Sequence, residues 1–397
     1  MSQPAPSPLL LRGASVVGPR GVAAGTDLLV EAGRIARVCG PGEAGGVRAD
    51  ALLDLEGLTL YPGFIDAHIH GAIGVDVLEA GDEDLHRVAL FLARHGVTAW
   101  LPTLVPAPAE DYARAARAVE RLMRAQDTLP AAARAVGIHY EGPFVNEAQC
   151  GALRTRYFRT YKSKDELEDL ATPAVEGAAR MMTLAPEVEG GVELVRELAS
   201  RGWVVSIGHT RAGIETLDLA REAGARHMTH FPNAMPGLHH RDPGPVGWGL
   251  TNDGVTVDLI ADGVHSDPLM LRLVLRSKTP RLVSLISDAV SPAGLGDGEY
   301  RVWGETIKVE GGRTRNERGS IAGSVITMRD AASLVSTLGF EETDIARMAA
   351  LNPARLLGLE KEYGSIEEGK RADLFALDAA GRVRLTLVGG RVAFEDK

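Results

Sequence analysis

The sequence predicts an α/β protein, a (β/α)8 barrel of the TIM type with a small discontinuous β-sandwich domain that both ends of the chain form together. Two observations lead to this expectation. In the middle of the chain, short apolar runs alternate with amphipathic helical patterns, and this alternation is typical of βα units. At both ends, the chain consists instead of short β-rich pieces separated by glycine.

The two terminal segments, residues 1–57 and 358–397, are expected to form the small domain. In the first, residues 14–18, 27–30 and 34–38 are short stretches rich in valine, leucine and isoleucine. In the second, residues 364–392 return to the same texture. Because neither segment contains a helical pattern between its strands, we expect the two to pack together as one sheet domain beside the barrel.

The barrel is expected over residues 58–357. Leu85, Val88 and Leu92 illustrate its helical patterns, since they share one face of a helix. Eight strands are expected, at residues 58–70, 98–105, 135–141, 181–187, 204–210, 227–233, 255–261 and 282–289. After the last of them, the glycine-rich residues 300–324 predict a hairpin, and a helical stretch is expected to end near Asn352 and Pro353.

The composition excludes several classes of partner. The formal net charge of −10 argues against binding to nucleic acid or to an anionic membrane. Cys39 and Cys150 are the only cysteines and form no CxxC pair, so we expect no disulfide framework and a reducing, cytoplasmic location. No stretch approaches the roughly 18 apolar residues of a membrane span, and the apolar patch at residues 9–11 is too short for a signal peptide.

Histidines and carboxylates end several of the predicted strands. His68 and His70 close the first strand, and because side chains alternate along a strand, both rings should point to the same face. Strands three, five, six and eight end in Glu141, His209, His230 and Asp288. The carboxyl ends of barrel strands meet on one rim, where active sites lie. These ligand types suit a divalent ion that makes its bound water more acidic.

Each of these residues alone has an ordinary structural explanation. A His-x-His pair occurs at many polar strand ends, and a histidine or carboxylate there can cap a turn or lie hydrogen-bonded in the core. The convergence of six such side chains on one rim favours a metal site instead. The residue types leave both the number of ions (one or two) and their identity (zinc, iron, manganese or cobalt) open.

Short motifs surround these ligands. They are PGFID at 62–66, EGPF at 141–144, GHT at 208–210, THFPNAM at 229–235, ADGVH at 261–265 and SDA at 287–289. Together they resemble the N-acetylglucosamine-6-phosphate deacetylases of the amidohydrolase superfamily. Tail motifs such as NPA at 352–354 and ADL at 372–374 are similar to those of many amidohydrolases. The resemblance spans nearly the whole chain.

This resemblance implies hydrolysis of the N-acetyl amide of an amino-sugar phosphate, with N-acetylglucosamine 6-phosphate as the first candidate. It implies one ion on Glu141, His209 and His230. A second ion would share Glu141 and be held by His68, His70 and Asp288. Asp288 would also be the catalytic residue, because a carboxylate beside a metal can accept the proton of water and return it to the leaving nitrogen.

The resemblance also implies substrate contacts at Asn233 and Ala234, in the Asn-Ala-Met motif. Positions matching Arg241 and His265 hold the sugar phosphate in the family, and the arginine comes from the neighbouring subunit of a homodimer. A guanidinium fork matches phosphate oxygens well. The alternatives are a solvated loop for Arg241 and a helix-entry position for His265.

One position departs from the family. Relatives carry a histidine in a Gly-Ala-His motif that polarises the acetyl carbonyl, whereas this chain has Leu153. Because leucine cannot donate a hydrogen bond, that role should pass to a metal ion or to Arg154 or Arg156. Arg159 either meets another anionic group of the substrate or faces solvent.

The departure at Leu153 keeps other functions open. One is an amidohydrolase for another N-acyl amino sugar, such as N-acetylgalactosamine 6-phosphate. Another is an enzyme for N-acyl-D-amino acids, and the third is a catalytically dead barrel retained as a scaffold. Metal analysis and a substrate screen would distinguish them.

Overall fold

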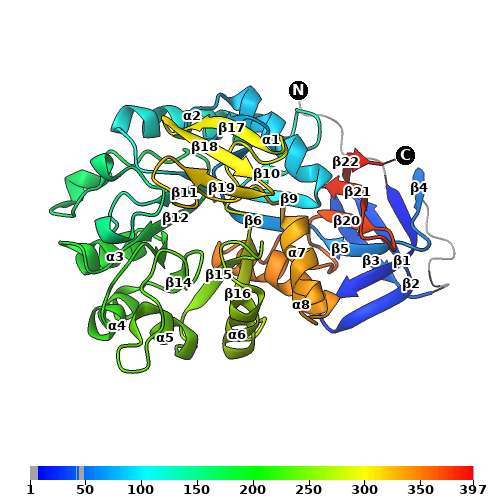
Figure 1. Ribbon diagram of the computed structural model, residues 1–397. Helices are drawn as coiled ribbons and strands as arrows, with labels where there is room; N and C mark the ends of the chain where they lie inside the picture. Colours follow the sequence, from blue (N-terminus) through cyan, green and yellow to red (C-terminus); the bar gives the residue numbers. More distant parts are fainter. Residues whose placement is uncertain (1–7, 42, 44–48, 397) are drawn as a thin grey trace.

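The computed structural model describes residues 8–41, 43 and 49–396 and shows a barrel with a separate sheet beside it (Figure 1). The other positions, including parts of the predicted terminal segments, lie outside the described residues. The barrel strands are β6 (Phe64–Ile69), β9 (Val97–Leu104), β11 (Gly137–Glu141), β12 (Ala179–Leu184), β13 (Val204–Ile207), β14 (His227–Met228), β15 (Thr256–Ile260) and β16 (Val283–Ile286). In the described part of the chain, no helix is both long and apolar enough to cross a membrane.

Every pair of neighbouring barrel strands is parallel, and the pairing follows the chain from β6 to β16. An isolated β-bridge between Ile69 and Ala289 joins the end of β6 to the segment after β16, so the sheet nearly closes on itself. The third strand is in two pieces, because β10 (Arg134–Ala135) pairs with β9 ahead of β11. This topology confirms the predicted barrel.

Helices follow most of the strands and cover the barrel. They are α1 (Asp82–Arg94), α2 (Ala109–Ala125), α3 (Gly191–Ser200), α4 (Ile214–Ala223), α5 (Gly244–Thr251), α6 (Pro268–Lys278) and α7 (Met328–Thr337). Leu85, Val88 and Leu92 are buried on one face of α1, as their spacing predicts. After β11 the chain instead forms three short 3-10 turns, η1 (Glu147–Gln149), η2 (Thr155–Tyr157) and η3 (Lys164–Leu167), which leaves this loop free to lie over the barrel rim.

The predicted strands extend too far at their carboxyl ends. His209, His230 and Asp288 lie beyond β13, β14 and β16, and each has a positive φ, of 48°, 33° and 50°. A residue in this region of backbone space cannot continue an extended strand, so each strand ends before its ligand. Glu141 alone is the last residue of its strand.

The terminal segments form a second sheet, with blue and red strands side by side in Figure 1. Its strands, in spatial order, are β22 (Arg391–Glu395), β21 (Val383–Val388), β20 (Leu374–Leu377), β5 (Thr59–Pro62), β1 (Leu9–Gly18), β2 (Gly21–Glu31) and β3 (Arg34–Cys39), while β4 (Ala51–Asp54) also pairs with β1. Leu11, Leu28, Leu60 and Leu374 share its own apolar core.

The prediction of a single strand over residues 58–70 was wrong. The chain divides there at Gly63 into β5, which belongs to the terminal sheet, and β6, which opens the barrel. A Cβ on Gly63 would lie 2.0 Å from Thr98 Oγ1, so the residue allows a close approach that no side chain would permit. Both halves are apolar, so the hydrophobic pattern could not reveal the change of sheet.

Beyond the barrel strands, the predicted hairpin is a three-stranded antiparallel sheet of β17 (Gly298–Val302), β18 (Glu305–Glu310) and β19 (Arg313–Asn316), yellow to orange in Figure 1. The helical stretch expected to end near Pro353 runs further, through α8 (Glu342–Ala346), a π-helical turn at Arg347–Leu351 and α9 (Asn352–Leu356). Pro353 lies at the start of α9, directly after the π-helical turn, and does not end the helical path.

Candidate active site

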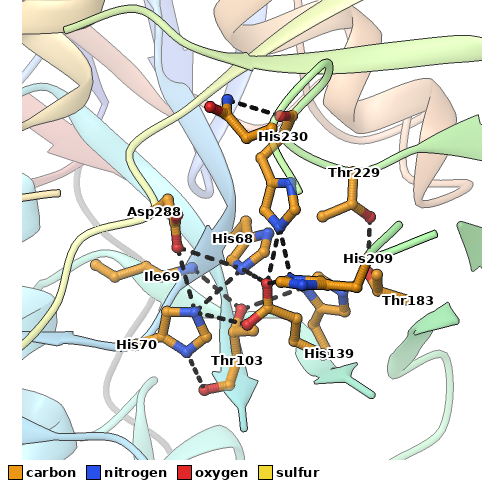
Figure 2. Close-up of polar contacts among 12 residues, drawn as sticks. His68, Ile69, His70, Thr103, His139, Thr183, His209, Thr229, His230 and Asp288 are labelled. Carbon is orange, nitrogen blue, oxygen red and sulfur yellow. Dashed lines mark hydrogen bonds and ion pairs between the residues drawn. The ribbon is translucent and has the colours of Figure 1, made fainter. Parts of the chain in front are cut away.

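Six side chains from five strand ends converge on the rim of the barrel (Figure 2). Glu141 lies at their centre. Its Oε1 is 2.9 Å from both His209 Nε2 and His230 Nε2, and its Oε2 is 3.3 Å from His70 Nε2. Asp288 Oδ1 lies 3.4 Å from His68 Nε2 and 3.2 Å from His70 Nε2. The structure thus brings all the predicted ligands together.

Five of these six ligands, all except Asp288, form two groups that share Glu141. One group is His68, His70 and Glu141, and the other is Glu141, His209 and His230. All are buried, and their ligand atoms lie within 4.8 Å of one another inside each group. Three nitrogen or carboxylate ligands around one point are the usual donor set of a catalytic divalent ion with an open position.

The hydrogen bonds of the rings fit this interpretation. His70 Nδ1 donates to Thr103 O at 3.2 Å, and His209 Nδ1 donates to Gln149 O at 2.7 Å. The Nε2 atoms of these rings therefore face the carboxylates, and either a proton on the nitrogen or a bound cation must lie between each nitrogen and its neighbouring oxygen. Backbone acceptors of this kind fix the orientation of metal-binding histidines. The residues therefore fit a metal ion.

The electrostatics of the cluster favour a positive charge at its centre. Burial raises the pKa of the Glu141 carboxyl, but the surrounding imidazoles of His68, His209, His230 and His70 outweigh burial and hold that pKa well below its usual range. Burial lowers the pKa of His70, but hydrogen bonds to Asp288 and Glu141 outweigh it and raise that pKa to about 10. Metal binding at such a site competes with protons for the ligand atoms.

Two buried carboxylates that were not predicted from the sequence support the ligands. Asp66 accepts hydrogen bonds from Ser287 Oγ at 2.6 Å and from the backbone N–H of His68 at 3.4 Å, so it ties β6 to the residue before Asp288. Asp258 accepts from the backbone N–H of His230 and lies 2.9 Å from His227 Nε2. Both residues lie inside predicted strands, at 58–70 and 255–261, and nothing in the strand pattern separates a supporting carboxylate from a ligand.

A cavity of about 330 Å³ opens above the ligands. Besides five of the ligands, its lining comprises Gly151, Ala152, Leu153, Asn233, Ala234, Ile260, His265, Trp303, Ser320, Ile321 and Gly323. Its volume falls within the range of small-molecule sites. A larger cavity of about 670 Å³ lies where β12 and β13 begin, but its lining contains no histidine and a single carboxylate, Glu176. The smaller cavity therefore holds the chemistry.

Four of the predicted substrate residues line this cavity: Leu153, Asn233, Ala234 and His265. His265 Nδ1 lies 2.7 Å from Asp262 Oδ2, which orients its ring. Trp303, Ser320 and Ile321 line the cavity as well and were not predicted. They lie in and after the β17–β19 sheet, far along the chain from the ligand motifs, and only the Trp303-Gly304 pair carries a turn signal.

The structure does not bring the predicted arginines to this cavity. Arg154 donates to Pro106 O at 2.8 Å and, like Arg156, stacks on the ring of Tyr157. Arg159 pairs with Asp169 at 2.7 Å. Arg241 lies in an exposed loop and contacts His240 Nε2 at 2.9 Å. Within one subunit, none of the four is part of the pocket lining.

Comparisons with known proteins agree with this geometry. The amidohydrolase family model matches residues 59–393. The chain is 37% identical to the N-acetylgalactosamine-6-phosphate deacetylase of Escherichia coli O157:H7, over 84% of this chain and 87% of that protein. It is 36% identical to the N-acetylglucosamine-6-phosphate deacetylase of Bacillus subtilis (strain 168), over 85% of both chains.

Solved structures are similar over almost their full length. N-acetylglucosamine-6-phosphate deacetylase from Thermotoga maritima has a TM-score of 0.85 at 32% identity, covering 98% of this chain and 100% of that one. A mutant of the Mycobacterium smegmatis enzyme, solved in complex with N-acetyl-D-glucosamine-6-phosphate, has a TM-score of 0.88 at 31% identity, with the same coverage. The chain therefore belongs to the amidohydrolase family and, within it, to the N-acetylglucosamine-6-phosphate deacetylases.

Proposed function

We propose that this protein is a metal-dependent hydrolase that converts N-acetylglucosamine 6-phosphate and water into glucosamine 6-phosphate and acetate. The observation that carries the proposal is the complete set of ligands around Glu141, with Asp288 at the floor of the pocket. The full set also argues against a catalytically dead scaffold. The names of its relatives supply the substrate class.

An amide needs a nucleophile, a polarised carbonyl and a proton for its leaving nitrogen. When bound, a divalent ion acidifies water and polarises the carbonyl. Asp288 is placed to move the proton, because it lines the pocket while its Oδ1 lies within 3.4 Å of His68 and His70. It would accept a proton from the attacking water and deliver it to the nitrogen as the C–N bond breaks.

We propose two ions, because both ligand groups are complete and share Glu141. One would lie on His68 and His70, with Asp288, and the other on His209 and His230. Zinc, iron, manganese and cobalt all accept these ligands. Two ions would also compensate for Leu153, because they can polarise the acetyl carbonyl without a protein donor.

For the substrate, we propose that Asn233 and the backbone around Ala234 contact the sugar and that His265 contacts its phosphate. Arg241 would complete the phosphate site from the neighbouring subunit of a homodimer. Its exposure, and its place outside the pocket lining of its own subunit, are consistent with such an arrangement.

We further propose a cytoplasmic location. The two free cysteines, Cys39 and Cys150, support it.

A substrate screen with metal-reconstituted protein tests the function. The panel is N-acetylglucosamine 6-phosphate, N-acetylgalactosamine 6-phosphate, both unphosphorylated sugars and N-acyl-D-amino acids. We expect the highest kcat/KM with N-acetylglucosamine 6-phosphate. The galactosamine epimer is the second candidate, because a relative at 37% identity carries that name. Activity on D-amino acids alone would contradict the proposal.

A further inference from the structure

The pocket has a side that is apolar. We call Ala152, Leu153, Trp303 and Ile321 the apolar wall. Asn233 and His265 come from the loops after β14 and β15, where the apolar Ile260 also lines the pocket. The apolar wall comes instead from the loop after β11 and from the region of the β17–β19 sheet, where Ser320 adds one hydroxyl. The lining is therefore mostly apolar beside Trp303, and its polar side chains for a sugar lie mainly on the side of Asn233 and His265.

Trp303 has a backbone conformation that tryptophan rarely adopts. Val302 pairs with Glu305, so Trp303 and Gly304 form a two-residue turn between β17 and β18. Their φ angles are 53° and 85°. Turns with two positive φ values favour glycine, asparagine or aspartate at the first position. A bulky residue held there against its preference is a reason to look for a function.

The turn places the indole ring against the cluster of predicted metal ligands. Trp303 is only 8% exposed although it lies at the tip of a turn. Its ring stands edge-on to that of His70, with centroids 5.3 Å apart and an interplanar angle of 84°. The side chain therefore fills space next to the point at which a scissile carbonyl would react.

The two halves of the apolar wall are connected. Arg318 donates through Nη2 to the carbonyl oxygen of Ala152 at 3.0 Å and lies 3.5 Å from the carboxylate of Glu305, the residue after the Trp303-Gly304 turn. Leu153 is 3% exposed and follows directly. The loop after β11 and the turn that carries Trp303 are therefore held as one surface.

We infer that the apolar wall receives the acyl group of the substrate and that Trp303 limits its length to acetyl. This inference rests on the proposed function. A carbonyl at the cluster carries two substituents, the amino sugar and the acyl chain. The sugar and its phosphate need polar partners, which lie on the Asn233 and His265 side. The acyl chain needs none and fits the apolar side, where the indole ring beside His70 would limit the space for additional methylenes.

Acyl-length kinetics test this inference. The substrates are N-acetyl, N-propionyl and N-butyryl glucosamine 6-phosphate, and the proteins are the wild type, Trp303→Gly and Trp303→Phe. We expect the wild type to prefer acetyl over butyryl by at least roughly 100-fold in kcat/KM, and Trp303→Gly to reduce that preference by at least about tenfold. Trp303→Phe, which keeps a ring, should stay near the wild type. Glycine suits the positive φ of this turn, and thermal unfolding checks that the loss of the buried indole leaves the variant folded.

Tyr300→Ala is the matched control, because Tyr300 is an aromatic residue of β17, the strand before the Trp303-Gly304 turn, and lies outside the pocket lining. An acyl preference that stays at the wild-type value in folded, metal-loaded Trp303→Gly would overturn the inference.

Isothermal titration of the three compounds into Asp288→Asn, with and without Trp303→Gly, provides a second readout that needs no turnover. If the wild type hydrolyses none of them, the proposed function fails, and this titration decides the inference alone. The inference would then be rejected if none of the compounds binds, or if the preference for the acetyl compound is the same with and without Trp303→Gly.

Discussion

Single residues hold this site in conformations that the rest of the barrel must support. His209, His230 and Asp288 all have positive φ, which costs on the order of 1 kcal/mol or more at each position. The neighbouring hydrogen bonds maintain these conformations, as when Asp258 accepts from the backbone N–H of His230. Because the chain turns sharply at each ligand, the side chains point to one centre rather than along their strands.

Asp288 is the residue whose loss should stop turnover without unfolding the site. Asp288→Asn keeps the size of the side chain and one oxygen ligand, but the amide cannot carry the proton. We expect kcat to fall by about 10²- to 10⁴-fold while metal content and thermal unfolding stay close to the wild type. Steady-state kinetics combined with metal analysis of the same sample checks this expectation. Near-normal kcat would remove Asp288 from its proposed role.

The two-ion proposal has its own test at His68 and His70. Purified protein should contain more than one equivalent of divalent metal, because both ligand groups are complete. The double variant His68→Asn, His70→Asn should retain about one equivalent, held by Glu141, His209 and His230. Elemental analysis after dialysis measures both, with His86→Asn on α1 as the control. A single equivalent in wild type and double variant alike would contradict two ions.

Elements of the fold were predictable where one local pattern decides them. The alternation of strands and helices predicted the barrel, and the amphipathic face of α1 predicted its packing. The convergence of His68, Glu141 and the other ligands followed from the rule that barrel strands end on one rim. In each case the relevant residues are close in sequence or repeat in a regular order.

The elements that were missed depend on contacts between distant segments. The change of sheet at Gly63 depends on β20 and on Thr98, which the local pattern does not contain. The place of Trp303 in the pocket depends on how the β17–β19 sheet folds back toward β6. Tertiary contacts of this kind have no signature in hydrophobic periodicity.

Gly63 provides a stability test for the junction of the two sheets. An added Cβ would overlap the side chain of Thr98, whose own position is fixed in β9. We expect Gly63→Ala to lower the free energy of unfolding by about 1–3 kcal/mol, as overpacking does in other cores. Urea denaturation measures the change. Gly237→Ala, where a Cβ would meet no atom within 4 Å, should leave stability nearly unchanged.

At the scale of the whole molecule, one subunit accounts for the chemistry but not for the recognition of phosphate. His265 lines the pocket, whereas Arg241 lies in an exposed loop outside its lining. A protein with a net charge of −10 repels an anionic substrate at long range, so a local cation matters for binding. We propose that the second copy in a homodimer supplies that cation, and the loop around Arg241 is where this can be tested.

Arg241→Ala should therefore lower kcat/KM selectively for the phosphorylated substrate. Loss of a charge-assisted contact costs about 1.5–3 kcal/mol, which corresponds to a decrease in kcat/KM on the order of 10- to 150-fold. The unphosphorylated sugar offers nothing for the guanidinium to bind, so its kcat/KM should change little. Arg211→Ala, a change of another exposed arginine that is not in the pocket lining, serves as the control. An equal loss for both sugars would contradict a phosphate contact and favour the N-acyl-D-amino-acid alternative.

Mixed dimers test whether Arg241 acts across the subunit boundary. When Arg241→Ala and Asp288→Asn chains are co-expressed, a mixed dimer would contain one site with Asp288 from its own subunit and Arg241 from its neighbour. The other site would lack both residues. Because random pairing makes about half of the dimers mixed, activity should recover to roughly a quarter of the wild-type value, far above the mean of the two parent variants. If Arg241 served its own subunit, no pairing of these two chains could create a complete site, and activity would stay at that mean.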